Sequence, residues 1–121
     1  MNNLGMRILV IDDEASILKM LALRLSRMGL QVETALTREE AIKKLNMNGH
    51  DLVLTDIIMP DISGHDVLNH VRFECKHSTP VIAMSGTPWL LEQSNFDAVL
   101  LKPCLNEDLL SVINRFLKKG R

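Results

Sequence analysis

The sequence predicts an α/β domain in which helices cover both faces of a mostly parallel, five-stranded sheet. Two observations indicate this fold class. Short apolar runs alternate along the chain with longer segments whose apolar residues recur at helical spacing. The apolar runs are nearly continuous, which is typical of parallel strands that are buried on both faces.

The first half of the chain contains three of the expected strands and two of the helices. Apolar residues recur at helical spacing between positions 17 and 28, and Gly29 ends this helix after about 14 residues. The second helix begins at Thr37–Glu40, which has the form of a capping box, and ends at Asn48–Gly49. The strands lie before, between and after these helices, at residues 8–11, 32–35 and 51–55.

The second half continues the alternation. A helix is expected from Gly64 to about Cys75, and Pro80 introduces a fourth strand at residues 81–84. Residues 99–101 form the fifth strand, and Asn106 is placed to cap a last helix with a strong apolar stripe.

Length and composition indicate a single domain, residues 1–121, with its core at about 6–117. With 121 residues the chain has the size of one domain, and no apolar stretch approaches the roughly 20 residues of a membrane span. The first residues lack the apolar core of a secretory signal, so a cytoplasmic location is expected. A net charge of −1 gives no electrostatic basis for nucleic-acid binding.

Charged residues follow three of the predicted strands. Asp12 and Asp13 follow the first, Asp56 the third and Lys102 the fifth. The carboxyl ends of parallel strands meet at one edge of a sheet, so three carboxylates and one ammonium are expected to share a crevice. Crowded carboxylates raise one another's pKa unless a cation compensates. Mg²⁺, for which Mn²⁺ would substitute, prefers such oxygen ligands.

This arrangement suits phosphoryl transfer. We expect Asp13 and Asp56 to be direct metal ligands, Asp12 to act through water or by orienting it, and a backbone carbonyl just after Asp56 to add one oxygen. An oxygen of Asp56 would then attack phosphorus and form an acyl phosphate. Lys102, and the hydroxyl of Ser85 at the end of the fourth strand, would bind the phosphoryl oxygens.

These residues carry a family resemblance that covers essentially the whole chain. The chain resembles the receiver domain of bacterial two-component response regulators. The motifs that carry the resemblance occur in order at suitable spacing: Ile11–Glu14, Asp56–Pro60 with Gly64, Ser85–Gly86 and Lys102–Pro103.

The resemblance implies a flavodoxin-like fold with strand order 2-1-3-4-5. It also implies transfer of a phosphoryl group from a kinase phosphohistidine to Asp56, with Mg²⁺ held by Asp13, Asp56 and the carbonyl of Ile58. Ser85 would be the switch hydroxyl and Lys102 the phosphate-binding ammonium. The Lys102–Pro103 peptide bond would be cis.

The chain departs from the family pattern in two places. Val99 occupies the position of a rotating aromatic residue, so an aromatic rotamer switch is excluded there. The segment between Ser85 and Lys102 is several residues short, so the fourth helix is expected to be shortened or irregular.

Two further predictions concern side chains outside the crevice. Trp89 is interpreted as a half-buried cover on the sheet edge, with a partner-anchoring role as the alternative. The histidines, His50, His65, His70 and His77, are expected to be solvated rather than catalytic.

The function expected is a phosphorylation-dependent signalling receiver that promotes only its own phosphorylation and dephosphorylation and is otherwise not an enzyme. Its expected partners are a sensor histidine kinase or phosphotransfer protein and a downstream protein or attached output domain, with homodimerisation as an option.

Three alternatives remain open. The first is an aspartyl phosphohydrolase, but such enzymes generally need an acid two positions after the nucleophile, where this chain has Ile58. The second is a flavin or nucleotide binder, which needs a phosphate-cradling loop after the first strand. This chain has Asp12 and Asp13 there, and their carboxylates repel phosphate in the absence of a metal. A pseudo-receiver used only for protein contacts is disfavoured by the joint presence of the acids, Ser85 and Lys102.

Overall fold

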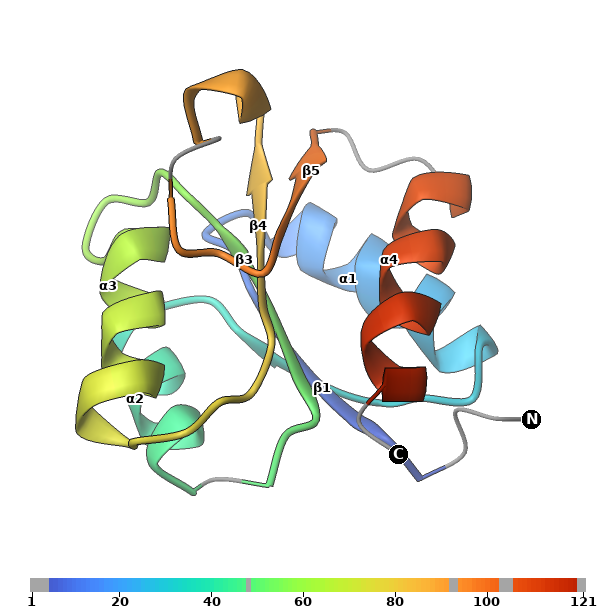
Figure 1. The fold of residues 1–121 in the computed structure, drawn as a ribbon, viewed down its shortest axis with the longest axis horizontal. Helices are drawn as coiled ribbons and strands as arrows, with labels where there is room; N and C mark the ends of the chain where they lie inside the picture. Colours follow the sequence, from blue (N-terminus) through green and yellow to red (C-terminus); the bar gives the residue numbers. More distant parts are fainter. Residues whose placement is uncertain (1–4, 48, 92–93, 103–105, 120–121) are drawn as a thin grey trace.

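Five parallel strands form one sheet in the order β2-β1-β3-β4-β5 (Figure 1). The structure, a computed structural model, describes residues 5–47, 49–91, 94–102 and 106–119. The predicted fold class and strand order are confirmed, and each predicted strand matches to within one residue at either end. The strands are β1 (Arg7–Ile11), β2 (Gln31–Ala35), β3 (Leu52–Asp56), β4 (Val81–Ser85) and β5 (Ala98–Leu101).

Helices cover both faces of this sheet. On one face lie α1 (Ala15–Arg27) and α4 (Asn106–Lys119), and on the other lie α2 (Arg38–Met47) and α3 (Gly64–Asn69) (Figure 1). The helix of α3 continues through η1 (His70–Glu74), a π-helical turn in which the N–H of Cys75 donates to the carbonyl of His70 at 2.9 Å. The long helix predicted from Gly64 is therefore present, with a widened last turn.

The pleat of the strands divides the core into two layers. In β1, Ile8 and Val10 pack with α1 and α4, whereas Leu9 and Ile11 pack with α2 and α3. Both layers are almost completely buried, which explains why the strands lack polar alternation.

The predicted capping box of α2 is only half correct. The N–H of Glu40 donates to the hydroxyl of Thr37 at 3.2 Å, but the Glu40 carboxylate accepts from the N–H of Leu36 rather than of Thr37. The reciprocal box occurs instead at α3, where Ser63 and Asp66 each accept from the other's backbone N–H at 3.1 Å. The hydrogen bonds from Ser63 lower the pKa of Asp66.

A single 3₁₀ turn, η2 (Pro88–Leu91), follows β4 in place of a full helix, as expected from the short segment. The interpretation of Trp89 as a half-buried cover was wrong, because 61% of this residue is exposed. The predicted cis bond at Lys102–Pro103 lies outside the described residues.

The prediction for His50 was also wrong. Only 4% of its side chain is exposed, and its Nε2 lies 2.7 Å from Oε1 of Glu33 on β2. The second Glu33 oxygen accepts from Arg7 at 2.7 Å, so one carboxylate joins β1, β2 and the segment before β3. Among the described helices, none has the length and apolar character to cross a membrane.

Candidate functional site

The predicted site residues lie together at the carboxyl edge of the sheet. Asp12 directly follows β1, Asp56 and Ser85 end β3 and β4, and Lys102 directly follows β5. The strand register is regular here, with Asp56 opposite Met84, and Ser85 opposite Leu101. Because these strand ends lie level, residues 90 positions apart in sequence share one crevice.

The acidic residues form a compact group. Asp12, Asp13 and Asp56 each offer a carboxylate oxygen, and these oxygens lie within 4.8 Å of one another. Asp12 and Asp56 are buried, whereas Asp13 is exposed. The group therefore opens to solvent on the side of Asp13.

The ammonium of Lys102 lies between the two buried acids. Its Nζ is 3.1 Å from Oδ2 of Asp12 and 3.1 Å from Oδ2 of Asp56. Burial alone would lower the pKa of Lys102, but its contacts with Asp12 and Asp56 outweigh burial and raise that pKa. Burial dominates at Asp12, where it raises the pKa despite the hydrogen bond from the N–H of Glu14 and the nearby positive charge of Lys102.

The two oxygens of Asp12 have different surroundings. Oδ1 accepts from the N–H of Glu14 at 3.0 Å, which fixes the carboxylate at the entry to α1. Oδ2 is fully buried, and Lys102 approaches it outside the direction of a hydrogen bond, so this oxygen has no hydrogen-bond partner among the described residues. A buried carboxylate oxygen with free lone pairs beside two other carboxylates fits a hard divalent cation such as Mg²⁺.

Close backbone packing positions Asp56. Its Oδ1 accepts from the N–H of Ile57 at 2.9 Å, while Oδ2 faces Lys102. The first residue of α3, Gly64, packs so closely that an added Cβ would lie 2.7 Å from the carbonyl oxygen of Asp56 and 2.8 Å from Cδ1 of Ile57. The N–H of Gly64 donates to the carbonyl of Ile57 at 2.9 Å. Gly64 is therefore needed where α3 meets the end of β3.

Ser85 has a neighbour that the sequence reasoning missed. The N–H of Thr87 donates to the hydroxyl of Ser85 at 3.0 Å, and the two hydroxyl oxygens lie 3.4 Å apart. The carbonyl of Thr87 accepts from the N–H of Leu90 at 3.0 Å, which begins the turn of η2. The sequence signal that could have predicted this contact is the hydroxyl of Thr87, two positions after Ser85.

Two other residues border the crevice. Ile58 lies in the loop after β3 with 83% of its surface exposed, and the metal-binding role of its carbonyl stays a prediction. Glu14 places Oε1 3.9 Å from the Lys102 ammonium, but its side chain is 60% exposed, so this is a weak surface contact.

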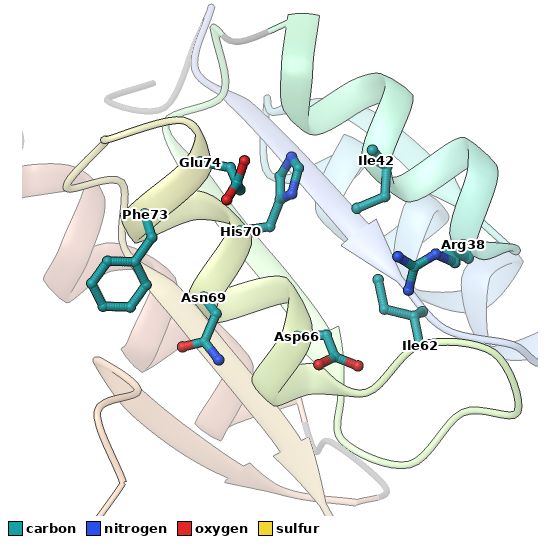
Figure 2. A pocket seen from close by; sticks show the side chains of 8 residues that line it. All are labelled: Arg38, Ile42, Ile62, Asp66, Asn69, His70, Phe73 and Glu74. Atoms are coloured by element: carbon teal, nitrogen blue, oxygen red, sulfur yellow. The ribbon is translucent and has the colours of Figure 1, made fainter.

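A cavity of about 410 Å³ lies away from this crevice, between α2 and α3. Figure 2 shows that apolar and charged side chains line it together. Arg38 points toward Ile62 and Asp66, and Glu74 lies beside His70. None of the predicted site residues lines it. The grouped acids and Lys102 lie instead at the carboxyl edge of the sheet.

Comparison with known families agrees with the geometry. A family model described as "Response regulator receiver domain" matches residues 8–114. The chain belongs to the response regulator receiver family. The matched range contains every residue of the crevice described above.

Two relatives from different organisms are similar to this chain over almost its full length. It is 34% identical over 122 residues to the two-component response regulator ARR11 of Arabidopsis thaliana, covering 95% of this chain and 23% of that one. It is 30% identical over 117 residues to the probable transcriptional regulator ycf27 of Cyanidium caldarium, covering 93% of this chain and 46% of that one. The receiver thus spans half or less of the length of these relatives.

Solved structures show the same fold. The response regulator TrrA of Thermotoga maritima, in complex with Mg(2+)-BeF, is 30% identical with a TM-score of 0.81, covering 92% of this chain and 98% of that one. A response regulator receiver domain protein from Clostridium thermocellum is 32% identical with a TM-score of 0.83, covering 95% and 96%.

Proposed function

We propose that this receiver accepts a phosphoryl group from a phosphohistidine onto Asp56 and thereby switches a protein-interaction surface. The observation that carries this proposal is the grouping of three carboxylates within 4.8 Å, with the Lys102 ammonium 3.1 Å from both buried acids. Such a group combines a nucleophilic oxygen with a cation for the phosphoryl oxygens.

The donor set suits Mg²⁺. Asp13 and Asp56 would hold it directly, with Asp12 acting through water or by orienting it and the carbonyl of Ile58 as a further oxygen. When bound, the cation would offset negative charge on the carboxylates and on the phosphoryl oxygens. The related TrrA is described in complex with Mg(2+)-BeF, which supports the same chemistry here.

Residues of the chain position Asp56 for the transfer and bind the transferred group. The N–H of Ile57 holds one oxygen of Asp56, so the other oxygen is fixed beside Lys102. As that oxygen forms a bond to phosphorus, the N–P bond of the donor breaks and its electron pair returns to the imidazole nitrogen. Lys102 then donates to a phosphoryl oxygen instead of pairing two carboxylates.

Ser85 provides the link to the surface. The new group adds about −1.5 to −2 charge and strong acceptor oxygens. The hydroxyl of Ser85 can donate to one of these oxygens, and the N–H of Thr87 follows it through the 3.0 Å bond. Because the carbonyl of Thr87 caps η2, a shift of Ser85 would move that turn.

The receiver would catalyse only the gain and loss of its own phosphoryl group. The phosphohydrolase alternative expects an acid two positions after the nucleophile, where the exposed Ile58 stands. The pseudo-receiver alternative leaves the grouping of Asp13, Asp56, Ser85 and Lys102 without a use.

The expected partners follow from this chemistry. They are a histidine kinase or phosphotransfer protein as donor, and a downstream protein or an attached output domain as target. A cytoplasmic location, the lack of nucleic-acid binding by this domain and a homodimeric form stay predictions.

The test is intact mass after incubation with acetyl phosphate and Mg²⁺. The native chain should gain one phosphoryl group that hydroxylamine removes, as expected for an acyl phosphate. Asp56→Asn should gain none, whereas Asp108→Asn, in the exposed first turn of α4, should behave as native. An adduct that persists unchanged in Asp56→Asn would contradict the proposal.

A further inference from the structure

Thr55 is a polar residue at a position in β3 where packing alone would favour an apolar one. The three strand residues before it are Leu52, Val53 and Leu54, and Thr55 itself is completely buried. Valine has almost the same shape and has no hydroxyl to remove from water, which is an unfavourable step for threonine. The buried hydroxyl of Thr55 therefore needs a reason other than packing.

This hydroxyl contacts the backbone of the proposed phosphoacceptor. It donates to the carbonyl oxygen of Asp56 at 2.9 Å, and the bond is buried. The same oxygen lies against the start of α3, where a Cβ added to Gly64 would be 2.7 Å away from it. The carbonyl of Asp56 is thus held both by a hydrogen bond and by close packing.

The peptide group that contains this carbonyl also holds the Asp56 side chain. The carbonyl of Asp56 and the N–H of Ile57 belong to one planar group, so any rotation of that group moves the oxygen and the N–H together. The N–H donates to Oδ1 of Asp56 at 2.9 Å. The other oxygen, Oδ2, faces the ammonium of Lys102 at 3.1 Å. The hydroxyl of Thr55 is thereby connected, through a single peptide group, to the carboxylate of Asp56.

We infer that Thr55 is a positioning residue for phosphoryl transfer, because its hydroxyl orients the peptide group that aligns the Asp56 carboxylate. This inference rests on the proposed function and adds a residue outside the acidic group, Ser85 and Lys102. Consecutive side chains of a strand point to opposite faces of the sheet, so the Thr55 side chain points away from that of Asp56. Thr55 acts through the backbone of its neighbour.

The expected effect of losing this hydroxyl is kinetic. Reacting atoms need to be held about 3 to 3.5 Å apart in the correct orientation, and a misplacement of about 1 Å can slow a reaction about a hundredfold. In Thr55→Val the peptide group gains a smaller freedom than this, because Gly64 still packs against its oxygen. We therefore expect the rate constant for labelling to fall about tenfold.

The experiment compares three variants by their rates of labelling with acetyl phosphate at saturating Mg²⁺. Thr55→Val removes the hydroxyl and keeps the shape, whereas Thr55→Ser keeps the hydroxyl and removes a buried methyl group. Ile82→Val, at a completely buried position in β4, is the matched control, because it should lose a similar amount of stability without changing the peptide group. Thermal melts check that the losses are similar.

Thr55→Val should be labelled about tenfold more slowly than the native chain, while Thr55→Ser and Ile82→Val should stay within about twofold of it. A purely structural role for Thr55 predicts a different order. Thr55→Ser also loses buried contacts, so it would then be impaired as well.

The amide of Ile57 gives a direct signature in ¹H–¹⁵N NMR spectra recorded without Mg²⁺. Its proton should move upfield in Thr55→Val, because the hydrogen bond to Oδ1 of Asp56 weakens, and should return toward the native position in Thr55→Ser.

An Ile57 amide signal that is unchanged in Thr55→Val would overturn the positioning role, whatever the labelling rate. A Thr55→Ser protein that is labelled as slowly as Thr55→Val would overturn it too. Neither result would affect the proposed function, because the native chain would still be labelled. A native chain that acetyl phosphate does not label would overturn the proposed function, whereas the NMR comparison would still test the connection from Thr55 to Ile57.

Discussion

Replacing Lys102 by methionine tests the electrostatic account of the crevice. The substitution keeps an unbranched apolar stem but removes the only positive charge within 4 Å of Asp12 and Asp56 among the described residues. Each contact of 3.1 Å is worth about 5 kcal/mol of gross Coulomb energy at an effective dielectric constant of about 20. Much of this is offset by the desolvation of the charged groups in the native protein.

The net effect follows from what remains after the substitution. Breaking a buried ion pair from one side costs about 3 to 5 kcal/mol, because the other charge stays buried. The lower end applies here, since 21% of the Lys102 side chain is exposed. We expect the free energy of unfolding of Lys102→Met at pH 7 in EDTA to fall by about 3 kcal/mol, and its Tm by roughly 10 °C.

The pH dependence gives a second, independent signature. The folded-state pKa of Asp12 is already raised by burial, so protonating this residue favours the folded state. Asp12 therefore stabilises the fold at a pH below its unfolded-state pKa, and this contribution is lost as the pH rises through its folded-state pKa. Without Lys102 this pKa rises further, so acidification from pH 7 to 5 should recover part of the loss. The stability that corresponds to the raised pKa of Lys102 is fully present at neutral pH and is lost only as the pH rises through its folded-state pKa, so it adds no pH dependence between pH 5 and 7.

The assay is urea denaturation followed by far-ultraviolet circular dichroism, with and without Mg²⁺. Mg²⁺ should stabilise Lys102→Met more than the native chain, because only the variant lacks another cation at the buried acids. Lys19→Met, an exposed position on α1, is the control and should stay within about 0.5 kcal/mol of native. A Lys102→Met protein as stable as native in EDTA at pH 7 would refute this electrostatic reasoning.

Three further predictions test neighbouring parts of the structure. Gly64→Ala should lower stability by about 1 to 3 kcal/mol and slow labelling by acetyl phosphate, because the added Cβ would lie 2.7 Å from the carbonyl oxygen of Asp56; native thermal melts and labelling rates would contradict this. Asp13→Asn should weaken Mg²⁺ binding in calorimetry roughly tenfold or more, and unchanged affinity would remove this residue from the coordination sphere. Glu33→Gln should be less sensitive to acid than native, because the bonds from His50 and Arg7 lower the pKa of Glu33, and the stability they provide is lost as the pH falls through that pKa. Parallel acid-denaturation curves would exclude this contribution.

The strands and the crevice were predictable because both depend on local signals. A buried parallel strand leaves a continuous apolar run, and the charged residue that ends it marks the sheet edge without knowledge of the other strands. Asp12, Asp56 and Lys102 were found in this way. Their convergence required only that the strands be parallel, and the register confirms this.

The errors concern side chains whose environment is set by distant residues. His50 is buried because Glu33, 17 positions earlier, supplies an acceptor from β2, and no local pattern encodes that pairing. Trp89 is exposed because η2 is one turn that packs no ring against the sheet. Thr87 was missed because its role is a hydrogen bond to Ser85, which depends on the path of the backbone after β4.

The crevice also contains a buried charged group that lowers the stability of the fold. Elsewhere at the core the buried residues are apolar or, as at His50 and Thr55, have a hydrogen-bond partner. At Asp12 a charged oxygen is fully buried without a hydrogen bond, although an asparagine or serine would satisfy the same turn at Glu14. A buried polar atom without a hydrogen bond, in a core whose other polar groups are paired, indicates a functional requirement at that position. A divalent cation held there would offset the negative charge of the three acids, which the single ammonium of Lys102 balances only in part.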